Sequence, residues 1–154
     1  MFESSPRPFI FAHRGASSHA PENTLAAFEL AIQQNADGIE LDVKLTADGH
    51  VVAIHDATVD RTTGARGRVK DLPLTDLRSL DAGSFFAPNF KAEKIPTLED
   101  VFEAVGRRTL INVELTLYSR QCSRQTSSTL KISSFVNASP PRLNTPASPL
   151  SSQL

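Results

Sequence analysis

Short apolar runs separated by polar loops recur along the first three quarters of the chain and predict about four β-strands. Residues 9–12 are continuously apolar, which is typical of a buried strand. Residues 39–45 alternate apolar and charged side chains with a period of two, which predicts a strand with one charged face. Residues 51–54 and 110–115 form two further apolar runs. Because helical segments lie between these runs, the pattern indicates an α/β fold.

Helical spacing of the apolar positions predicts three helices, at about residues 25–34, 75–80 and 97–105. Asn23 or Thr24 is expected to cap the first of them. Residues 58–71 contain two glycines and no apolar period, which predicts an irregular polar loop.

The second and third predicted strands lie close together in the sequence. Only five residues separate 39–45 from 51–54, and they include the turn signal Asp48-Gly49. Parallel neighbours need a crossover of about a dozen residues. These two strands therefore do not form a standard βαβ unit unless the chain first doubles back.

The composition of the chain changes near residue 117. Residues 1–117 hold 12 basic and 17 acidic side chains, whereas residues 118–154 hold four basic and no acidic ones. All seven glycines lie at or before Gly106, and the last 37 residues contain ten serines, three threonines and four prolines. This composition predicts a folded partial domain over residues 8–117 and a mostly disordered Ser/Thr/Pro-rich tail over residues 118–154.

Length, charge and cysteine content exclude several classes of protein. A chain of 154 residues corresponds to one modest domain. The single cysteine, Cys122, allows no internal disulfide framework and no cysteine zinc cluster. A formal net charge of −1 without a basic stripe argues against a nucleic-acid surface. The apolar run near the N-terminus is too short for a signal peptide or a membrane span, so we expect a cytoplasmic protein.

Carboxylates within the predicted strands are the first candidates for chemistry. Glu40 and Asp42 project from the same face of one strand, which suits two oxygen ligands of a hard cation, although an exposed charged face gives the same pattern. Glu114 lies inside another apolar strand, where a lone carboxylate is costly unless it is paired or bound to metal. A third oxygen ligand is therefore plausible.

Two histidines each follow a short apolar strand, where α/β folds place functional groups. His13 and His55 are candidates for a shared acid and base role, against the alternative that each is a hydrogen-bonded structural histidine. Arg14 next to His13 offers a forked donor to a phosphate or carboxylate. The alternative for Arg14 is an ion pair with Glu22 or another nearby acid, and both can hold at once.

Several short strings occur together in a fixed order and carry a family resemblance. They are His13-Arg14-Gly15, Pro21-Glu22-Asn23-Thr24, Ile39-Glu40-Leu41-Asp42-Val43, Asp48-Gly49, His55-Asp56, Arg61-Thr62-Thr63-Gly64, Ile95-Pro96-Thr97-Leu98-Glu99 and Asn112-Val113-Glu114-Leu115. In this order and spacing they closely resemble the glycerophosphodiester phosphodiesterase family. The resemblance covers about residues 8–117.

The resemblance implies a fold, a reaction and a set of site residues. The fold is a TIM-type (β/α)₈ barrel of the phospholipase C-like kind, and the reaction is hydrolysis of a glycerophosphodiester to sn-glycerol 3-phosphate and an alcohol. It implies that a divalent cation, Ca²⁺ or Mg²⁺, is bound by Glu40, Asp42 and Glu114. His13 and His55 match the acid and base pair, and Arg14 matches a phosphate-binding arginine.

The resemblance also has two departures. Thr116 follows Leu115 where the family commonly has lysine, a further phosphate contact. A barrel of this class needs about 250 residues, so we expect roughly the first half of one. Such a half-barrel leaves unpaired edges and an uncovered core, which predicts marginal stability, aggregation or reliance on another chain, such as an intact homologue. The abrupt change of composition after residue 117 suggests a shifted reading frame or a premature gene end.

Two alternative functions stay open at this point. One is a catalytically inactive fragment of such an enzyme, which the missing half favours. The other is a related barrel of the sphingomyelinase D-like or phosphoinositide-specific phospholipase kind. The strings Arg61-Thr62-Thr63-Gly64 and Ile95-Pro96-Thr97 fit the glycerophosphodiesterase pattern better than this second alternative.

Overall fold

The structure is a computed structural model, and it describes residues 7–115. The predicted disordered tail at residues 118–154, with Cys122, lies outside the described residues. Thr116, which departs from the family pattern, lies outside them as well.

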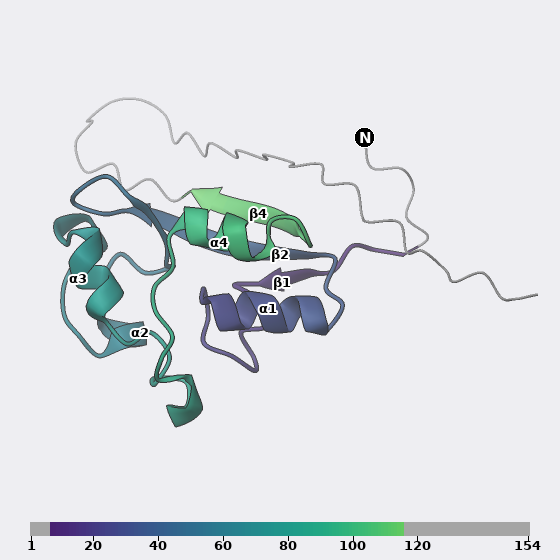
Figure 1. The fold of residues 1–154 in the computed structure, drawn as a ribbon, viewed down its shortest axis with the longest axis horizontal. Coiled ribbons are helices and arrows are strands. Elements are labelled where there is room, and N and C mark those ends of the chain that lie inside the picture. Colours follow the sequence, from purple (N-terminus) through teal and green to yellow (C-terminus); the bar gives the residue numbers. More distant parts are fainter. Residues whose placement is uncertain (1–6, 116–154) are drawn as a thin grey trace, which may run out of the picture.

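A four-stranded sheet is built around one central strand (Figure 1). The strands are β1 (Phe11–His13), β2 (Gly38–Leu45), β3 (Val51–Ala53) and β4 (Leu110–Leu115). β2 pairs in parallel with both β1 and β4, and its last residues pair antiparallel with β3. The chain thus doubles back after β2, as the short Asp48-Gly49 link requires, and the prediction of an α/β fold with four strands is confirmed.

The described residues form the helices α1 (Leu25–Gln33), α2 (Asp60–Thr63), α3 (Leu74–Ser79) and α4 (Leu98–Val105), with 3₁₀ turns η1 (Val69–Asp71) and η2 (Pro88–Phe90). α1, α3 and α4 begin and end close to the predicted positions, whereas α2 was not predicted. Thr24 is the N-cap of α1, since its Oγ1 accepts a hydrogen bond from the backbone N–H of Ala27. Thr97 and Asp100 form a capping box at the start of α4.

The prediction of an irregular loop over residues 58–71 is wrong. This segment contains α2 and η1, and it buries Val59 and Val69 in a second apolar cluster with Val52 of β3 and Leu77 of α3. Pattern reasoning failed here because each helical piece is four residues or fewer, which is too short to show a helical period.

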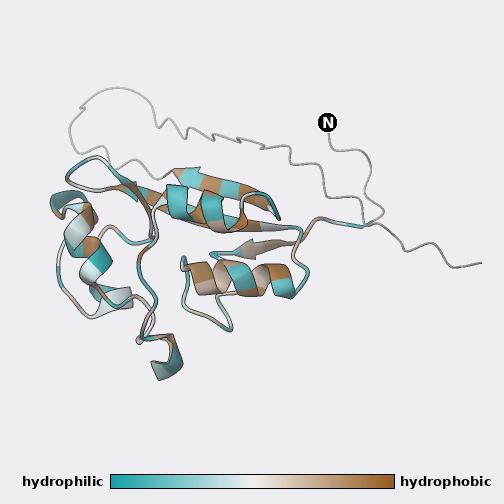
Figure 2. Cartoon of the chain, in the orientation of Figure 1, coloured by the Kyte–Doolittle hydropathy of each residue, from teal (hydrophilic) through white to brown (hydrophobic). Residues whose placement is uncertain are grey.

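The main core lies between the sheet and two helices. Ile39, Leu41 and Val43 of β2 pack with Phe28 of α1 and Val101 of α4. Figure 2 shows polar and apolar residues alternating along α1, α4 and β4. Since side chains alternate along a strand, Glu40 and Asp42 of β2 belong to the opposite face of the sheet from this core.

The first strand is formed but is not buried, contrary to the prediction. Phe9, Ile10 and Phe11 are 43%, 59% and 40% exposed. The physical reason is that β1 pairs with β2 alone among residues 7–115, so no strand covers its outer edge. Within the same residues, no helix has both the length and the apolar character needed to cross a membrane.

Candidate active site

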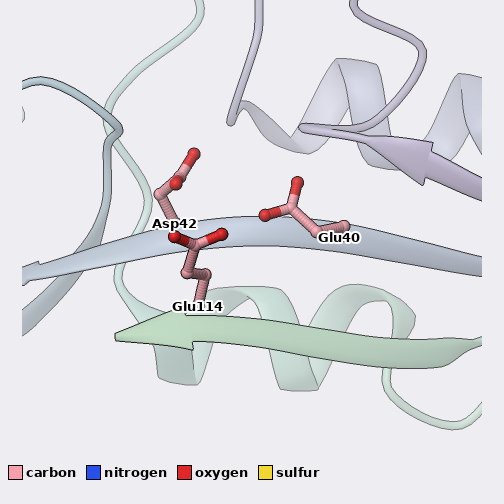
Figure 3. Close-up of side chains that lie close together, drawn as sticks. All are labelled: Glu40, Asp42 and Glu114. Atoms are coloured by element: carbon pink, nitrogen blue, oxygen red, sulfur yellow. The ribbon is translucent and has the colours of Figure 1, made fainter. Parts of the chain in front are cut away.

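Three carboxylates from two neighbouring strands converge on the face of the sheet opposite the core (Figure 3). Glu40 and Asp42 are two residues apart on β2, and Glu114 lies on β4, where it is the Cα partner of Asp42. Each of the three residues offers one oxygen, and these oxygens all lie within 4.8 Å of one another. The sequence prediction that these residues come together is therefore met by the parallel register of β2 and β4.

The three carboxylates of the cluster are partly buried and repel one another. Glu40 is 9% exposed and Asp42 is 3% exposed, whereas Glu114 is exposed. Burial raises the pKa of Glu40 above its ordinary value, and the nearby charges of Asp42 and Glu114 raise it further. The chain therefore holds like charges together in a place where they destabilise one another.

The geometry of the cluster fits a divalent cation. Oxygen ligands lie about 2.3–2.6 Å from Ca²⁺, so two of them on opposite sides of one ion are about 4.6–5.2 Å apart. The three oxygens lie within 4.8 Å of one another, so none is too far from the others to share such an ion. A cation at this position would also compensate the charge repulsion between the carboxylates. These three residues thus form an acidic cluster that can bind a metal.

Arg14 directly follows β1, and its backbone contacts the acidic cluster. Its backbone N–H donates a 3.0 Å hydrogen bond to Oε2 of Glu40, and its φ of +55° puts it in the left-handed region. The next residue, Gly15, also has a positive φ, and a Cβ there would lie 2.7 Å from the carbonyl carbon of Ala27 in α1. Gly15 is required at this point because the loop passes directly over the start of α1.

The guanidinium of Arg14 is held by two carboxylates. Its Nη1 donates a 3.1 Å hydrogen bond to Oε1 of Glu22, and its buried Nε lies 3.2 Å from Oδ2 of Asp42 as an ion pair without an aligned hydrogen bond. The ion pair with Glu22 that the sequence suggested is therefore present. The phosphate-binding role of Arg14 stays a prediction.

Asn23 is a site residue that sequence reasoning missed. Rather than capping α1, it is buried with a φ of +56°, and its amide pairs with Asp42 in both directions. Nδ2 of Asn23 donates to Oδ2 of Asp42 at 3.3 Å, and the backbone N–H of Asp42 donates to Oδ1 of Asn23 at 3.4 Å. The side chain thereby orients a candidate metal ligand. The available signal in the sequence is the residue type, because asparagine tolerates a positive φ better than most other residues do.

His13 lies at the end of β1, opposite Glu40 in the register of β1 and β2. Its Nε2 is 3.9 Å from Oε2 of Glu40, and its side chain is 69% exposed. His13 is therefore next to the acidic cluster and open to solvent, which suits a residue that exchanges protons with a bound molecule.

His55 follows β3 and is held by the next residue in the chain. Its Nδ1 lies 2.7 Å from Oδ1 of Asp56, and its side chain is 44% exposed. An ionised carboxylate accepts hydrogen bonds only, so the ring donates its Nδ1–H to Asp56. In the neutral ring, Nε2 is then the unprotonated nitrogen.

A chain of charged contacts that the sequence did not predict continues from Asp56. Nε of Arg61 donates to Oδ2 of Asp56 at 2.7 Å, and the other two nitrogens of Arg61 donate to Glu22 at 2.7 and 2.8 Å. Hydrogen bonding to Arg61 is the main cause that lowers the pKa of Asp56 to about 2, and it also lowers the pKa of Glu22. Both acids stay ionised at neutral pH.

Comparison with known proteins decides the family. The model of the glycerophosphoryl diester phosphodiesterase family matches residues 13–140, which is most of the chain. The chain belongs to this family. Its relatives include the glycerophosphodiester phosphodiesterase of Caldanaerobacter subterraneus subsp. tengcongensis, 54% identical over 110 residues, which cover 71% of this chain and 45% of that protein. The glycerophosphodiester phosphodiesterase 1 of Bos taurus is 48% identical over 114 residues, 73% of this chain and 33% of its own length.

Solved structures agree with the family assignment. A phosphodiesterase of Oleispira antarctica, solved with the product sn-glycerol-3-phosphate, matches with a TM-score of 0.69 and 43% identity over 71% of this chain and 44% of its own. The glycerophosphodiester phosphodiesterase of Agrobacterium tumefaciens matches with a TM-score of 0.69 and 45% identity over 71% and 47%. This member of the family is thus a partial TIM-type barrel, and it spans less than half the length of these relatives.

Proposed function

We propose that the chain binds one divalent cation and hydrolyses glycerophosphodiesters to sn-glycerol 3-phosphate and an alcohol. The observation that carries this proposal is the convergence of Glu40, Asp42 and Glu114 on one face of the sheet, with His13 beside them. The product bound by the Oleispira relative supports this choice of substrate class over the phosphoinositide and sphingomyelin alternatives.

Glu40, Asp42 and Glu114 would hold the cation. When bound, a hard divalent cation neutralises phosphoryl oxygens and orients the attacking hydroxyl. The proposal covers both Ca²⁺ and Mg²⁺, because the three carboxylates offer the oxygen ligands that both of these hard ions prefer.

The two histidines divide the proton transfers. Because Asp56 fixes the proton of His55 on Nδ1, Nε2 of His55 accepts the proton of the attacking glycerol hydroxyl, whose oxygen forms the new bond to phosphorus. His13 donates its proton to the departing alcohol oxygen as the old phosphorus–oxygen bond breaks. The resulting cyclic phosphate is opened by water with the two roles reversed, which restores both rings.

Arg14 contributes a fixed positive charge on the phosphate side of the site. Glu22 occupies Nη1, and Asp42 lies next to Nε. The remaining terminal nitrogen, Nη2, is the donor that we assign to a phosphoryl oxygen. Its position is set by the two carboxylates rather than by the substrate, so little ordering is left for the binding step.

The open edge of β1 supports a proposal about partners. Phe9, Ile10 and Phe11 adjoin an edge that has no second strand within residues 7–115. A chain that supplies the remaining barrel strands, such as an intact homologue, would cover this edge with backbone pairing and apolar contact. We therefore include association with such a chain in the proposal, and sedimentation with and without an intact relative tests it.

The catalytic proposal is tested by identifying the products of glycerophosphocholine in ³¹P NMR with Ca²⁺, with Mg²⁺ and with chelator. We expect metal-dependent formation of sn-glycerol 3-phosphate, lost in Glu40→Gln and His13→Ala. The matched controls Glu103→Gln and His19→Ala change exposed residues that do not belong to the acidic cluster and are expected to keep the activity. Phosphocholine as the product, or turnover that persists in chelator, contradicts the proposed reaction. No turnover in the soluble chain contradicts activity of the chain by itself.

A further inference from the structure

The guanidinium of Arg61 is shared between two acids that lie on separate loops. Its Nε donates to Asp56, in the loop after β3, and its Nη1 and Nη2 donate to the two carboxylate oxygens of Glu22, in the loop before α1. All three contacts are 2.7–2.8 Å long. Charge-assisted hydrogen bonds of this length are the strong ones, and a forked guanidinium fixes the plane of each partner.

Glu22 anchors this arrangement to the interior of the protein. Its side chain is 16% exposed, and its Oε1 accepts from Arg14 as well as from Arg61. Arg61 itself lies on α2, next to the buried Thr62. The contacts of Arg61 therefore connect a partly exposed acid, Asp56, to two segments that are each held in place by buried neighbours.

Asp56 connects Arg61 to the ring of His55. One of its oxygens meets Nε of Arg61 at 2.7 Å, and the other meets Nδ1 of His55 at 2.7 Å. Asp56 is ionised at neutral pH and cannot donate a hydrogen bond, so the carboxylate that Arg61 holds in place is satisfied only by the ring with its proton on Nδ1. Without Arg61, the partly exposed carboxylate is free to rotate toward water, and the ring loses the contact that selects its tautomer.

We propose that Arg61 is a positioning residue that, through Asp56, holds the ring of His55 with Nδ1 protonated and Nε2 as the proton acceptor. The importance of this position for turnover rests on the proposed function. The geometric part of the proposal does not, because the tautomer of His55 can be measured in a chain that turns over no substrate.

The test is the ¹⁵N NMR spectrum of the His55 ring in the full chain at about pH 9, where an imidazole is neutral. In the unsubstituted chain, we expect the Nδ1–H form to dominate. In Arg61→Ala, we expect a mixture of both tautomers, and in Arg61→Lys, which keeps one charge but loses the fork, an intermediate proportion. Asp56→Asn removes the obligatory acceptor without a change of size, so it also yields a mixture and serves if Arg61→Ala fails to fold.

Arg78→Ala is the matched control. Arg78 likewise donates to an acid, Asp100 at 2.6 Å, but this pair joins α3 to α4. We expect its His55 spectrum to equal that of the unsubstituted chain.

Kinetic measurements on Arg61→Ala give a second test. This variant is expected to lower kcat by about 10- to 100-fold with little change in KM, since an acid or base contributes about 10²- to 10⁴-fold and only its orientation is lost.

Each outcome decides the proposal. A tautomer shift in Arg61→Ala and Asp56→Asn, absent from Arg78→Ala, supports it, and turnover is then expected to fall in the same variants. An unchanged His55 spectrum in folded Arg61→Ala overturns the proposal, whatever happens to turnover. A tautomer shift in a chain that shows no turnover even without substitutions supports the positioning role and removes the proposed function of the isolated chain.

Discussion

Asp42 and Glu114 are Cα partners across two parallel strands that are 72 positions apart in the sequence. The register of β2 and β4 therefore places one candidate ligand directly beside another, and Glu40 joins them from two residues earlier on β2. The cost of this arrangement is carboxylate repulsion at a partly buried position, which is the kind of strain that functional sites hold.

Removal of one charge from the cluster is expected to stabilise the metal-free chain. Burial and the charges of Asp42 and Glu114 raise the pKa of Glu40, so its ionised form opposes folding, and the loss of stability sets in as pH rises past its ordinary range. Glu40→Gln keeps an oxygen acceptor for the N–H of Arg14. We expect a higher urea midpoint than for the unsubstituted chain at pH 7 in chelator, and an unchanged midpoint for Glu103→Gln. A lower urea midpoint for Glu40→Gln would contradict charge repulsion among the three carboxylates.

The amide of Asn23 is expected to contribute to stability through its two contacts with Asp42. Asn23→Ala loses both hydrogen bonds and places alanine at a positive φ. Asn35→Ala is the matched control, because exposed Asn35 has a φ of +61° and no side-chain hydrogen bond to Asp42. We expect Asn23→Ala to lower the free energy of unfolding by about 1–3 kcal/mol more than the control does. Equal losses in urea titrations would assign the whole effect to the backbone.

A methyl group at Gly15 is expected to displace the loop that carries Arg14. The added Cβ meets the backbone and Cβ of Ala27 at 2.7–2.8 Å, on top of the strain of a φ of +78°. Gly49→Ala has a similar positive φ of +85° but meets nothing within 4 Å. We expect Gly15→Ala to destabilise the chain by about 2 kcal/mol or more beyond Gly49→Ala. Similar thermal midpoints for the two variants would show that the loop moves away from Ala27 at little cost in free energy.

The contact between Arg61 and Asp56 is expected to make the free energy of unfolding depend on pH in the acidic range. The hydrogen bond from Arg61 is the main cause that lowers the pKa of Asp56 from 3.8 to about 2, with a further contribution from His55. The contribution to stability is therefore complete above pH 4 and is lost as pH falls toward 2. Because both side chains are partly exposed, we expect Arg61→Ala to cost only about 1–2 kcal/mol at pH 7. Urea midpoints of the two chains, measured in metal-free buffer from pH 7 to 2, should converge at the acidic end. A constant difference across this range would exclude the ionised pair as its source.

Much of the fold could be predicted because its elements have a clear period. β4 occupies the predicted residues 110–115, and the alternation along β2 correctly separated the core residues from Glu40 and Asp42. The exposure of β1 could not be predicted, since an apolar run reads the same whether or not a further strand covers it. Burial depends on neighbours that the local pattern does not contain.

The site was predicted only as far as its residues form motifs. The three carboxylates and His13 were found from their places on strands, and Arg14 was correctly paired with Glu22. The roles of Asn23 and Arg61 were missed, because each acts through a tertiary contact to a residue at another place in the chain. The role of Asp56 was missed as well, although it contacts the neighbouring His55. Helical spacing alone does not reveal that Arg61 reaches Glu22, 39 positions away.

Calorimetric titration of the metal-free chain with Ca²⁺ measures directly whether the carboxylates of β2 and β4 form one cation site. We expect one ion per chain, with binding lost in Glu40→Gln and Asp42→Asn and kept in Glu103→Gln. Binding that survives in both Glu40→Gln and Asp42→Asn, or no binding of Ca²⁺ or Mg²⁺ to the folded chain, would contradict the metal site on which the proposed reaction depends.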